Sequence, residues 1–591
     1  MSKLPRMSYS DAITKTTQVR FGGLRHAENC GDGELYDMKN LTCADYPVMR
    51  TRSYREFDAS SLSGVCKAHV GDGWVLWIDE VGNLNYYAAG TTTMSIEIAQ
   101  LHDYKEKNQI IPFGERLLIL PERISLNVKY PIKGHFETIP TSLSGYAAGD
   151  AVLVGQTYKW ELCVFDGTIF QNMGNWAQDM NAKLTVAECT FRDGTIYDEA
   201  AHSNTISFSG LDTDLRKVFK AGDAIEISGL TTIPDNNKTA IVREVEEHLL
   251  RFSDYCFKPK KDTGGTALTE WEEAGTIVFS RTVPVLDFYF EHGLRLWGYR
   301  GKEIFASKQG DPTNFNVFDG LTDDSWYLET QGKGDFTGAI GAYYPYFFKR
   351  GCMITVYGTM PSAFQTHEKD MPGVAEGMEH ATAAAGGYVF WVSDDGVQIY
   401  AGDYPQGCRD VFGNGHIQAA LACSDGTRYF VQLKSGAEQA LYCFDTERKL
   451  WMKEDDVQAT CMYGYAGSAY AATENGVLVK LSGQGQSIEE EEQSITSFAE
   501  FGDITMSEPN RKAVSKVQLR LWTDGTLTVK LSYDGGAWQT VRQIEGDEAK
   551  TSVYLPVIPR RCDHFRIRLE GTGQWRLYSM AIEHYIGSAI F

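Results

Sequence analysis

The sequence has few of the features that mark membrane or disordered proteins. Only 17 of its 591 residues are proline, no long tract has biased composition, and 43% of the residues are hydrophobic. Such a composition buries enough apolar surface to fold, so we expect nearly all of the chain to be ordered. No stretch approaches the ~20 apolar residues that span a bilayer. The sequence therefore predicts no membrane insertion.

The first residues lack the apolar core of a signal peptide. Twelve cysteines are scattered along the chain without a CxxC pair or an evenly spaced framework. Several lie inside apolar runs, where a free thiol behaves as a small buried hydrophobic group. These absences predict a chain that is synthesised and folded in a reducing cytoplasm.

Positive charge is also scarce. Lysine and arginine number 56 against 78 acidic residues, which gives a formal net charge of −22. Because affinity for phosphates requires clustered Lys and Arg, this balance argues against a broad nucleic-acid-binding face. Plain solubility explains the acidity, and the same surface would also let DNA slide past without sticking.

Motifs of common enzymes are missing. The chain has no GxSxG elbow, Walker loop, dinucleotide fingerprint or HExxH pair. Two acidic pairs, Asp323 with Asp324 and Asp394 with Asp395, lie in predicted turns, where a turn role is favoured over metal binding or acid–base chemistry. Nothing singles out the two carboxylates that a glycosidase needs. We expect no enzymatic activity and no cofactor.

The histidines show no paired ligand spacing on a helix. His367 and His380 flank one loop, where a metal site is the minor alternative to ordinary loop residues. The segment from Ser532 to Trp538, SYDGGAW, is similar to the Asp-box turn of sialidase-type propellers but is one residue shorter before the tryptophan. An Asp-box is itself a folding element in which the aspartate ties a hairpin turn. A structural role is therefore favoured here, and no metal site is expected.

Short strands separated by turns fill most of the chain. Apolar runs of four to six residues are broken at Asp-Gly, Gly-Asn and Gly-Glu, as in antiparallel hairpins. Seven such units, two before and five after an interruption, repeat at about forty residues each. Because a four-stranded blade buries its faces only against its neighbours, the repeat predicts a β-propeller of about six or seven blades. A sandwich built from the same strands is the alternative.

The remaining segments differ in texture. The interruption alternates apolar and polar residues, which indicates a small inserted barrel or sandwich. The run Glu489–Glu492 is interpreted as a solvated linker rather than a regulatory acidic patch. The sequence thus predicts an all-β chain with an extended N-terminal arm at 1–60, a β-propeller-like body at 61–131 and 281–482, an inserted β-domain at 132–280, an acidic linker at 483–495 and a C-terminal β-sandwich at 496–591.

The most informative stretch runs from Leu294 to Phe318 and reads LRLWGYRGKEIFASKQGDPTNFNVF. Two short apolar strands flank a glycine turn, and a turn-rich Gly-Asp-Pro-Thr-Asn segment then leads to an aromatic residue. It contains no catalytic grouping. Five residues of its loop are candidates for a structural or subunit-contact role: Gly310, Asp311, Pro312, Asn314 and Phe315.

This stretch, together with FGGLRHAENCGDGELYDMKNLTCADYPVMRTR, FTGAIGAYYPYFFKRGCMITVYGTMPSAFQ and HFRIRLEGTGQWRLYSMAIEH, resembles a group of tail structural proteins of tailed bacteriophages. These are stabilisation or tail-tubular proteins, and more distantly similar are the propeller-bearing nozzle proteins of short-tailed phages. The resemblance covers 21–52 and about 285–591, while 132–280 is unmatched. Its most specific piece is the loop segment 310–315.

The resemblance implies a homo-oligomeric ring, six-fold in symmetry, that conducts double-stranded DNA and retains it before ejection. The protein would be a virion component assembled in the bacterial cytoplasm. Its partners would be other copies of itself, an adaptor, portal or other tail protein, and the host cell surface. The N-terminal arm would clasp a neighbouring subunit or the adaptor.

Two alternatives remain open at this point. The first is a host-recognition tail protein whose inserted domain or C-terminal sandwich binds surface glycans, with the aromatic loop GAYYPYFFKRG as a surface for sugar stacking. Aromatic blade cores explain that loop better. The second is a propeller enzyme that cleaves glycans.

Overall fold

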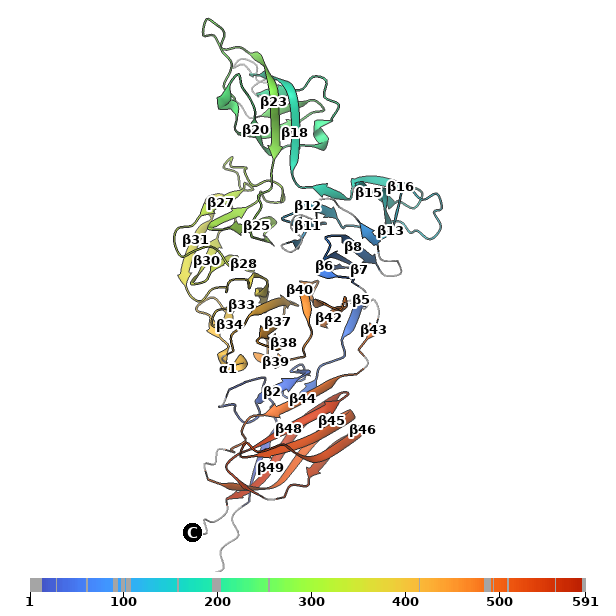
Figure 1. The fold of residues 1–591 in the computed structure, drawn as a ribbon, viewed down its shortest axis with the longest axis vertical. Coiled ribbons are helices and arrows are strands. Elements are labelled where there is room, and N and C mark those ends of the chain that lie inside the picture. The colour runs from blue at the N-terminus through green and yellow to red at the C-terminus, as the bar shows by residue number, and fades with distance from the viewer. Residues whose placement is uncertain are drawn as a thin grey trace, which may run out of the picture. The chain divides into compact units, whose positions relative to one another are not determined.

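The computed structural model is built almost entirely of β-strands (Figure 1). It describes residues 13–27, 29–59, 62–88, 94–96, 101, 108–156, 159–193, 204–252, 256–413, 415–482, 490–492, 494–506, 510–558 and 560–586. Within these ranges one α-helix, α1 (Arg409–Phe412), accompanies 49 strands. No helix in this part of the chain has the length and apolar character needed to cross a bilayer. The all-β class is confirmed.

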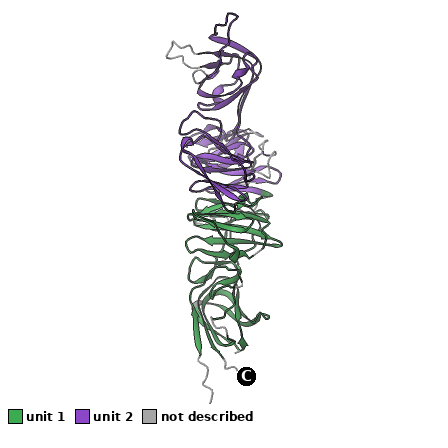
Figure 2. Cartoon of the chain, turned by 90° about the vertical axis from the view of Figure 1, so that its left-hand side faces the viewer, with its two compact units in different colours: residues 1–65, 371–591 green, residues 66–370 purple. Residues whose placement is uncertain are grey.

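The chain divides into two compact units, residues 66–370 and residues 1–65 with 371–591 (Figure 2). In the first unit, four small antiparallel sheets have the strand count of propeller blades. They consist of β6 (Val65–Gly71), β7 (Trp74–Asp79), β8 (Leu84–Ala88) and β9 (Met94–Ile96); β10 (Gln109–Phe113), β11 (Arg116–Leu120), β12 (Ile124–Asn127) and β17 (Ala177–Asp179); β24 (Phe288–His292), β25 (Arg295–Arg300), β26 (Glu303–Ala306) and β27 (Trp326–Glu329); and β28 (Gly338–Gly341), β29 (Pro345–Lys349), β30 (Cys352–Tyr357) and β31 (Gln365–Asp370).

The first strands of successive sheets contact one another, β10 with β24 and β24 with β28. Apolar side chains fill the space between neighbouring sheets. Trp297 from β25 and Phe347 from β29 are both fully buried and belong to one core, where their ring centroids lie 6.3 Å apart. Stacking of small sheets through such cores is the organisation of propeller blades.

The second unit contains three further sheets of this type. Their strands are β32 (Ala383–Ala385), β33 (Tyr388–Ser393), β34 (Gly396–Tyr400) and β35 (Gln406–Gly407); β36 (Ala419–Ser424), β37 (Arg428–Ser435), β38 (Glu438–Asp445) and β39 (Leu450–Lys453); and β40 (Ala459–Tyr465), β41 (Ser468–Thr473) and β42 (Leu478–Ser482) with β5 (Glu56–Ala59) and β43 (Glu490–Glu491). Again the first strands β32, β36 and β40 contact in series. The described residues thus hold seven blade-like sheets, so the propeller-like body is confirmed.

The segment 132–280, predicted as one inserted domain, forms two separate structures. The first is a four-stranded sheet of β13 (Ile132–Phe136), β14 (Ala151–Gln156), β15 (Lys159–Phe165) and β16 (Phe170–Asn175). The chain then returns through β17 to pair with blade strand β12. The second is a closed barrel of β18 (Ala182–Arg192), β19 (Thr205–Ser207), β20 (Ala224–Ser228), β21 (Thr239–Val245), β22 (Leu249–Phe252) and β23 (Glu270–Arg281). Alternation reveals strands but not the sheet that each strand joins, which is why the sequence merged the two.

The barrel has its own core. Phe191, Phe252 and Phe279 are almost fully buried in it, and Phe191 stacks on Trp271 at 5.4 Å. Strands β18 and β23 pair along their whole length, from Ala182 opposite Arg281 onwards. The points at which the chain enters and leaves the barrel therefore lie next to each other at its base.

The first sixty residues, predicted as an extended arm, form strands that pair within the same chain. These are β1 (Thr14–Gln18), β2 (Leu35–Lys39), β3 (Leu41–Thr42), β4 (Met49–Thr51) and β5. Strands β1 and β4 pair with β49, β2 pairs with β44, and β5 pairs with β42. Residues 1–12 of the predicted arm lie outside the described residues. The described part of this segment therefore pairs with strands from later in the same chain.

A buried ion cluster fixes this N-terminal segment. The Arg55 guanidinium lies 2.5 Å from a Glu454 carboxylate oxygen and 2.7 Å from one of Asp455, while Arg52 lies 2.6 Å from Glu492. Burial opposes the charge of Arg55, but Asp455 and Glu454 outweigh it and raise its pKa. Glu492 therefore has a structural partner, whereas residues 483–489 of the predicted acidic linker lie outside the described residues.

The C-terminal sheet is made by β44 (Thr496–Phe501), β45 (Lys512–Tyr533), β46 (Gln539–Leu555), β47 (Arg561–Cys562), β48 (Phe565–Thr572) and β49 (Trp575–Ile586), joined by β1 to β4. The first half of β45 pairs with β49 and the second half with β48, so the long hairpin belongs to two layers. The corner lies at Gly525, where a Cβ would overlap the carbonyl oxygen of Thr572. The predicted sandwich is confirmed, with N-terminal strands added to it.

Candidate functional site

The most specific part of the resemblance forms β25, β26 and the long connection 307–325 to β27. Arg295, at the start of β25, is only 2% exposed. Its side chain holds this connection by binding backbone carbonyl groups of the connection. Its guanidinium donates to the carbonyl oxygens of Ser307 at 2.8 Å, Thr322 at 3.0 Å and Asp324. Burial lowers the pKa of Arg295 from its ordinary value. A buried guanidinium whose N–H groups donate to several carbonyl oxygens makes a loop rigid, and it does so without an ion pair to a carboxylate.

Asp311 builds the first turn of the loop. Its Oδ1 accepts from the backbone N–H of Thr313 at 3.1 Å and from the Thr313 hydroxyl at 2.6 Å, and its Oδ2 lies 2.8 Å from the Lys220 ammonium. Burial by itself would raise the pKa of Asp311, but Lys220 and the accepted hydrogen bonds outweigh burial, so the pKa lies below its ordinary value. Lys220 belongs to the barrel segment, so the turn is also a contact with the barrel.

Asn314 joins the loop to the base of the barrel. It is 1% exposed, and its amide donates to Asp223 Oδ1 at 2.9 Å and to Asp311 Oδ2 at 2.5 Å. Its side-chain oxygen accepts from the backbone N–H of Ala224 at 3.2 Å. Asparagine suits this place because one side chain both donates to carboxylates and accepts from a backbone amide.

On the barrel side of this contact, Asp223 binds both Asn314 and Arg281. It is fully buried and lies 2.5 Å from the Arg281 guanidinium, whose other nitrogen donates to the carbonyl of Met180 at 3.1 Å. We name the group of Lys220, Asp223, Arg281, Asp311 and Asn314 the barrel joint. The sequence singled out the last two but missed the first three, because no local signal pairs residues that lie 58 to 91 positions apart.

The remaining loop candidates lie as follows. Phe315 is 5% exposed and packs in a core with Leu286 and Leu296, and Pro312 is buried. Gly310 is exposed and adopts a positive φ of 74° that favours glycine. Buried side chains cannot reach a neighbouring molecule, so Pro312, Asn314 and Phe315 fit the structural half of their predicted role.

The acidic pair at the end of the loop has turn roles. Asp324 is 3% exposed, and its Oδ2 accepts from the backbone N–H groups of Gly320 at 2.6 Å and Leu321 at 3.0 Å. Asp323 lies 3.3 Å from the Lys308 ammonium. Both carboxylates are thus used within the loop.

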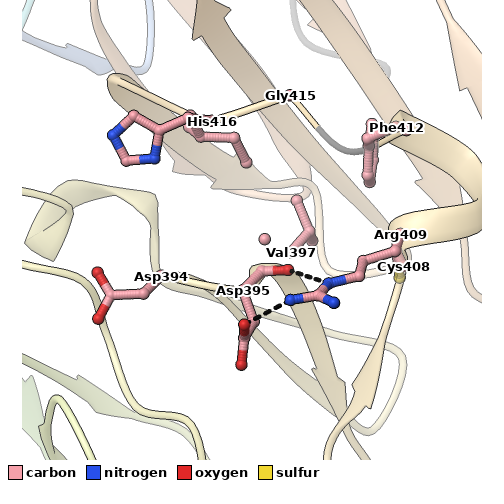
Figure 3. Close-up of a pocket in the computed structure, with 11 residues that line it drawn as sticks. Asp394, Asp395, Val397, Cys408, Arg409, Phe412, Gly415 and His416 are labelled. Atoms are coloured by element: carbon pink, nitrogen blue, oxygen red, sulfur yellow. Dashed lines mark hydrogen bonds and ion pairs between the residues drawn. The ribbon is translucent and has the colours of Figure 1, made fainter.

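The second acidic pair lines a pocket of about 260 Å³ beside α1 (Figure 3). Asp395 lies 2.5 Å from the Arg409 guanidinium, and the Asp394 carboxylate points away from that pair (Figure 3). Cys408 also lines the pocket, and burial raises its pKa to about 12. A thiol held in its neutral form is a poor nucleophile. Among the described lining residues, Asp395 is therefore paired with Arg409, and the Cys408 thiol is held in its neutral form.

The two histidines belong to different compact units. His367 lies on strand β31 with its ring 6.5 Å from that of Tyr357, and His380 lies in the 3-10 turn η4 (Glu379–Ala381). No group of three or more His, Cys, Asp or Glu side chains in the described part of the chain is placed to hold a metal ion.

The segment similar to an Asp-box lies in the C-terminal sandwich and not in a blade. Asp534 has a φ of 48°, and its Oδ1 accepts from the backbone N–H groups of Asp563 at 2.7 Å and His564 at 3.3 Å. It ties the β45–β46 turn to the turn before β48 instead of closing its own turn. Its role is structural.

The described cysteines are all free, and all but Cys66 and Cys256 are buried. Among them, burial raises the pKa of Cys189 to about 12. These thiols are packing groups.

No protein-family model matches the chain, and no curated protein matches its sequence. Among solved structures, an exo-β-1,3-galactanase from Phanerochaete chrysosporium is 9% identical, with a TM-score of 0.19 over 55% of this chain and 98% of that chain. The computationally designed Ika8 protein is 8% identical, with a TM-score of 0.29 over 72% and 99% of the two chains. BBS1N, crystallised with ARL6DN, is 10% identical, with a TM-score of 0.24 over 74% and 99%. None of the three is described as a phage protein, and likenesses this weak assign no activity.

Proposed function

We propose that this chain is a structural component of the tail of a tailed bacteriophage, and that several copies form a ring that conducts DNA and retains it before ejection. The barrel joint is the observation that carries the proposal. The residues that make the resemblance most specific hold the barrel against a blade, which is a structural role. The resemblance implies the tail, and the joint explains why these residue types stand in that loop.

The charge fits a conduit. With a net charge of −22, the surface repels the phosphate backbone, so DNA would pass without being gripped. A ring of such chains would need apolar contacts to overcome its own repulsion. The proposed partners are other copies of the chain and neighbouring tail proteins, and the proposed location is the virion.

Two measurements test this proposal. Antibodies against the chain should label the tails of phage particles from the host that encodes it, seen by immunoelectron microscopy. The purified protein should form rings in negatively stained images and should not shift duplex DNA in a gel at physiological salt. Particles without label, or a protein that shifts DNA at physiological salt, would contradict the proposal.

Host-glycan binding remains the second candidate because of one observation. In the aromatic loop, Phe347 and Phe348 are fully buried in the blade, whereas Tyr343 is 70% exposed and Tyr344 is 40% exposed. Exposed tyrosines suit sugar stacking. The Tyr344 and Tyr357 rings, however, meet at 66°, which offers no flat platform. Glycan-array binding by the whole chain that is lost on Tyr343→Ser would favour this candidate.

A further inference from the structure

Exposed apolar side chains gather in two stretches of the unit 66–370: five lie between positions 136 and 173, and a larger group lies between 294 and 357. Of the 20 large apolar residues exposed in the described part of the chain, seven lie between positions 294 and 357. The hydroxyl of one of them, Tyr327, is engaged by Glu303 at 2.6 Å. We name the other six the apolar rim: Leu294, Phe318, Leu321, Tyr343, Tyr344 and Tyr357.

The rim is held together by contacts between its segments. The Leu294 carbonyl accepts from the Gly310 N–H at 2.7 Å, and Arg295 fixes the carbonyl of Thr322, the residue after Leu321. A Cβ at Gly341 would lie 2.9 Å from the His292 Cβ, so the β28–β29 turn lies against the β24–β25 turn. Strands β25, β28 and β30 are labelled in Figure 1.

The remaining rim residues lie at the ends of the same strands. Tyr343 and Tyr344 form the β28–β29 turn, and the Tyr344 and Tyr357 rings are 4.6 Å apart. Two neighbouring blades therefore present their apolar turn residues next to each other.

Leu294 is placed where folding alone would not favour leucine. It is 57% exposed and has a φ of 59° in a two-residue turn with Gly293, whose φ is 62°. Such turns prefer Asn or Gly, because the left-handed conformation is unfavourable for an ordinary L-residue. Strain at an exposed position is a reason to look for a partner.

The rim is also pre-organised. Arg295 clamps the loop that carries Phe318 and Leu321, and the barrel joint anchors its other end through Asn314. A surface that is already rigid loses little conformational freedom on binding. The loss of conformational entropy on binding should therefore be small for the rim.

The composition of the rim indicates what covers it. Residues 336–348, which carry Tyr343 and Tyr344, contain no charged side chain although the whole chain carries a net charge of −22, and exposed Asp319 lies beside Phe318. Two copies repel each other by charge, so their contact is least costly where charge is absent. Aliphatic side chains such as Leu294 and Leu321, beside rings that meet edge to face, suit a protein surface better than a sugar.

We propose that the apolar rim is the contact surface for a second copy of this chain. The proposal names one side of the lateral contact of the proposed ring, which joins two different surfaces of neighbouring copies, and so rests on that function. With 150–250 Å² for a fully covered aromatic ring, the rim exposes on the order of 500 Å². A contact that covers this area on each copy buries about 1,000 Å² in total, the lower end for a specific interface.

Sedimentation velocity of the whole chain tests the proposal. The wild type should shift from the 66.0 kDa monomer to larger species as concentration rises. Phe318→Ser with Leu321→Ser should raise the dissociation constant by roughly 100-fold, about tenfold for each of these partly exposed side chains that the contact would cover. Val81→Ser is the matched control, since Val81 is 67% exposed in the β7–β8 turn of another blade.

Leu294→Asn separates association from folding. Asparagine tolerates the positive φ, so the melting temperature of the variant should equal or exceed that of the wild type while its self-association weakens about tenfold. Added salt should strengthen association of the wild type, because screening relieves the repulsion between acidic copies.

Three results would overturn the inference: a wild type that stays monomeric at all concentrations and salt levels, rim variants that associate as well as Val81→Ser, or association that weakens with salt. The proposed tail location is read separately, by immunoelectron microscopy. A chain that labels tails but associates through another surface would end this inference and leave the proposed function standing.

Discussion

Among single residues, Asn314 has the most concentrated role. One amide satisfies two carboxylates and one backbone N–H in a place with almost no solvent access. Buried polar groups cost little while they are paired and much when a partner is removed. The stability of the barrel joint should therefore depend on this side chain more than its size suggests.

Asn314→Ala should lower the free energy of unfolding by about 2–4 kcal/mol, because Asp223 Oδ1 and the Ala224 N–H lose their partner. Urea unfolding followed by circular dichroism measures the change. Asn316→Ala is the control, since Asn316 is exposed in the same loop. Equal losses in the two variants would show that the joint does not depend on the amide.

Asp311 makes part of the stability depend on pH. Its pKa in the folded protein lies below the ordinary value of 3.8. A depressed carboxylate pKa contributes stability that is complete above pH 3.8 and is lost as the pH falls through the folded pKa. Asp311→Asn should remove this share, so its unfolding free energy should fall less than that of the wild type below that pH.

The pH comparison uses chemical unfolding at a series of acidic pH values. Asp319→Asn is the control because Asp319 is an exposed carboxylate of the same loop. The interpretation fails if Asp311→Asn and the wild type lose stability in parallel as the pH falls.

At the scale of elements, the N-terminal strands decide how the second unit closes. Strand β5 supplies the fourth strand of a blade whose other main strands are β40 to β42, and the Arg55 cluster lies beside it. Strands from both ends of the chain thus meet in one sheet. A buried ion cluster contributes little net stability but is costly to break from one side.

Arg55→Ala should cost about 3–5 kcal/mol, because it leaves the buried Glu454 carboxylate without its cation and leaves Asp455 with Arg52 alone. Amide hydrogen exchange in β42 should accelerate as β5 detaches. Arg50→Ala is the comparison: the Arg50–Asp45 pair is more exposed, and such pairs contribute about 1 kcal/mol or less. Slow exchange in β42 of the Arg55 variant would contradict the assigned role.

For the whole molecule, the contacts between the barrel and the loop 307–325 stabilise both of them. The barrel has its own core, and its ends, Ala182 and Arg281, are paired neighbours. The loop in turn relies on Asp223 and Arg281 of the barrel segment. Removal of the barrel should therefore spare the blades but loosen the loop.

Replacing residues 183–280 by a short Asn-Gly turn should give a folded chain in which trypsin cuts after Lys308 much faster than in the wild type. The reason is that Asn314 loses Asp223 and the Ala224 N–H. Limited proteolysis with mass spectrometry measures the rate, and cutting after Arg350, in a different hairpin turn, is the internal reference. An unchanged rate after Lys308 would show that the loop is stable without the barrel.

The sequence by itself determined the all-β class, the repeated small sheets and the sandwich at the C-terminus, because apolar period and turn residues are local signals. It also singled out Asn314 and its loop. Local signals could not show that Asp223 and Arg281 meet that loop, that β5 completes a distant blade, or that 132–280 divides into two structures.

Those features were decided only by the tertiary structure, since each depends on partners far apart in the chain. The apolar rim belongs to the same class. Leu294, Phe318 and Tyr343 look like ordinary strand and turn residues in the sequence, and only their exposure together in the folded unit distinguishes them from core. Burial is a property of the whole fold, so no local pattern predicts it residue by residue.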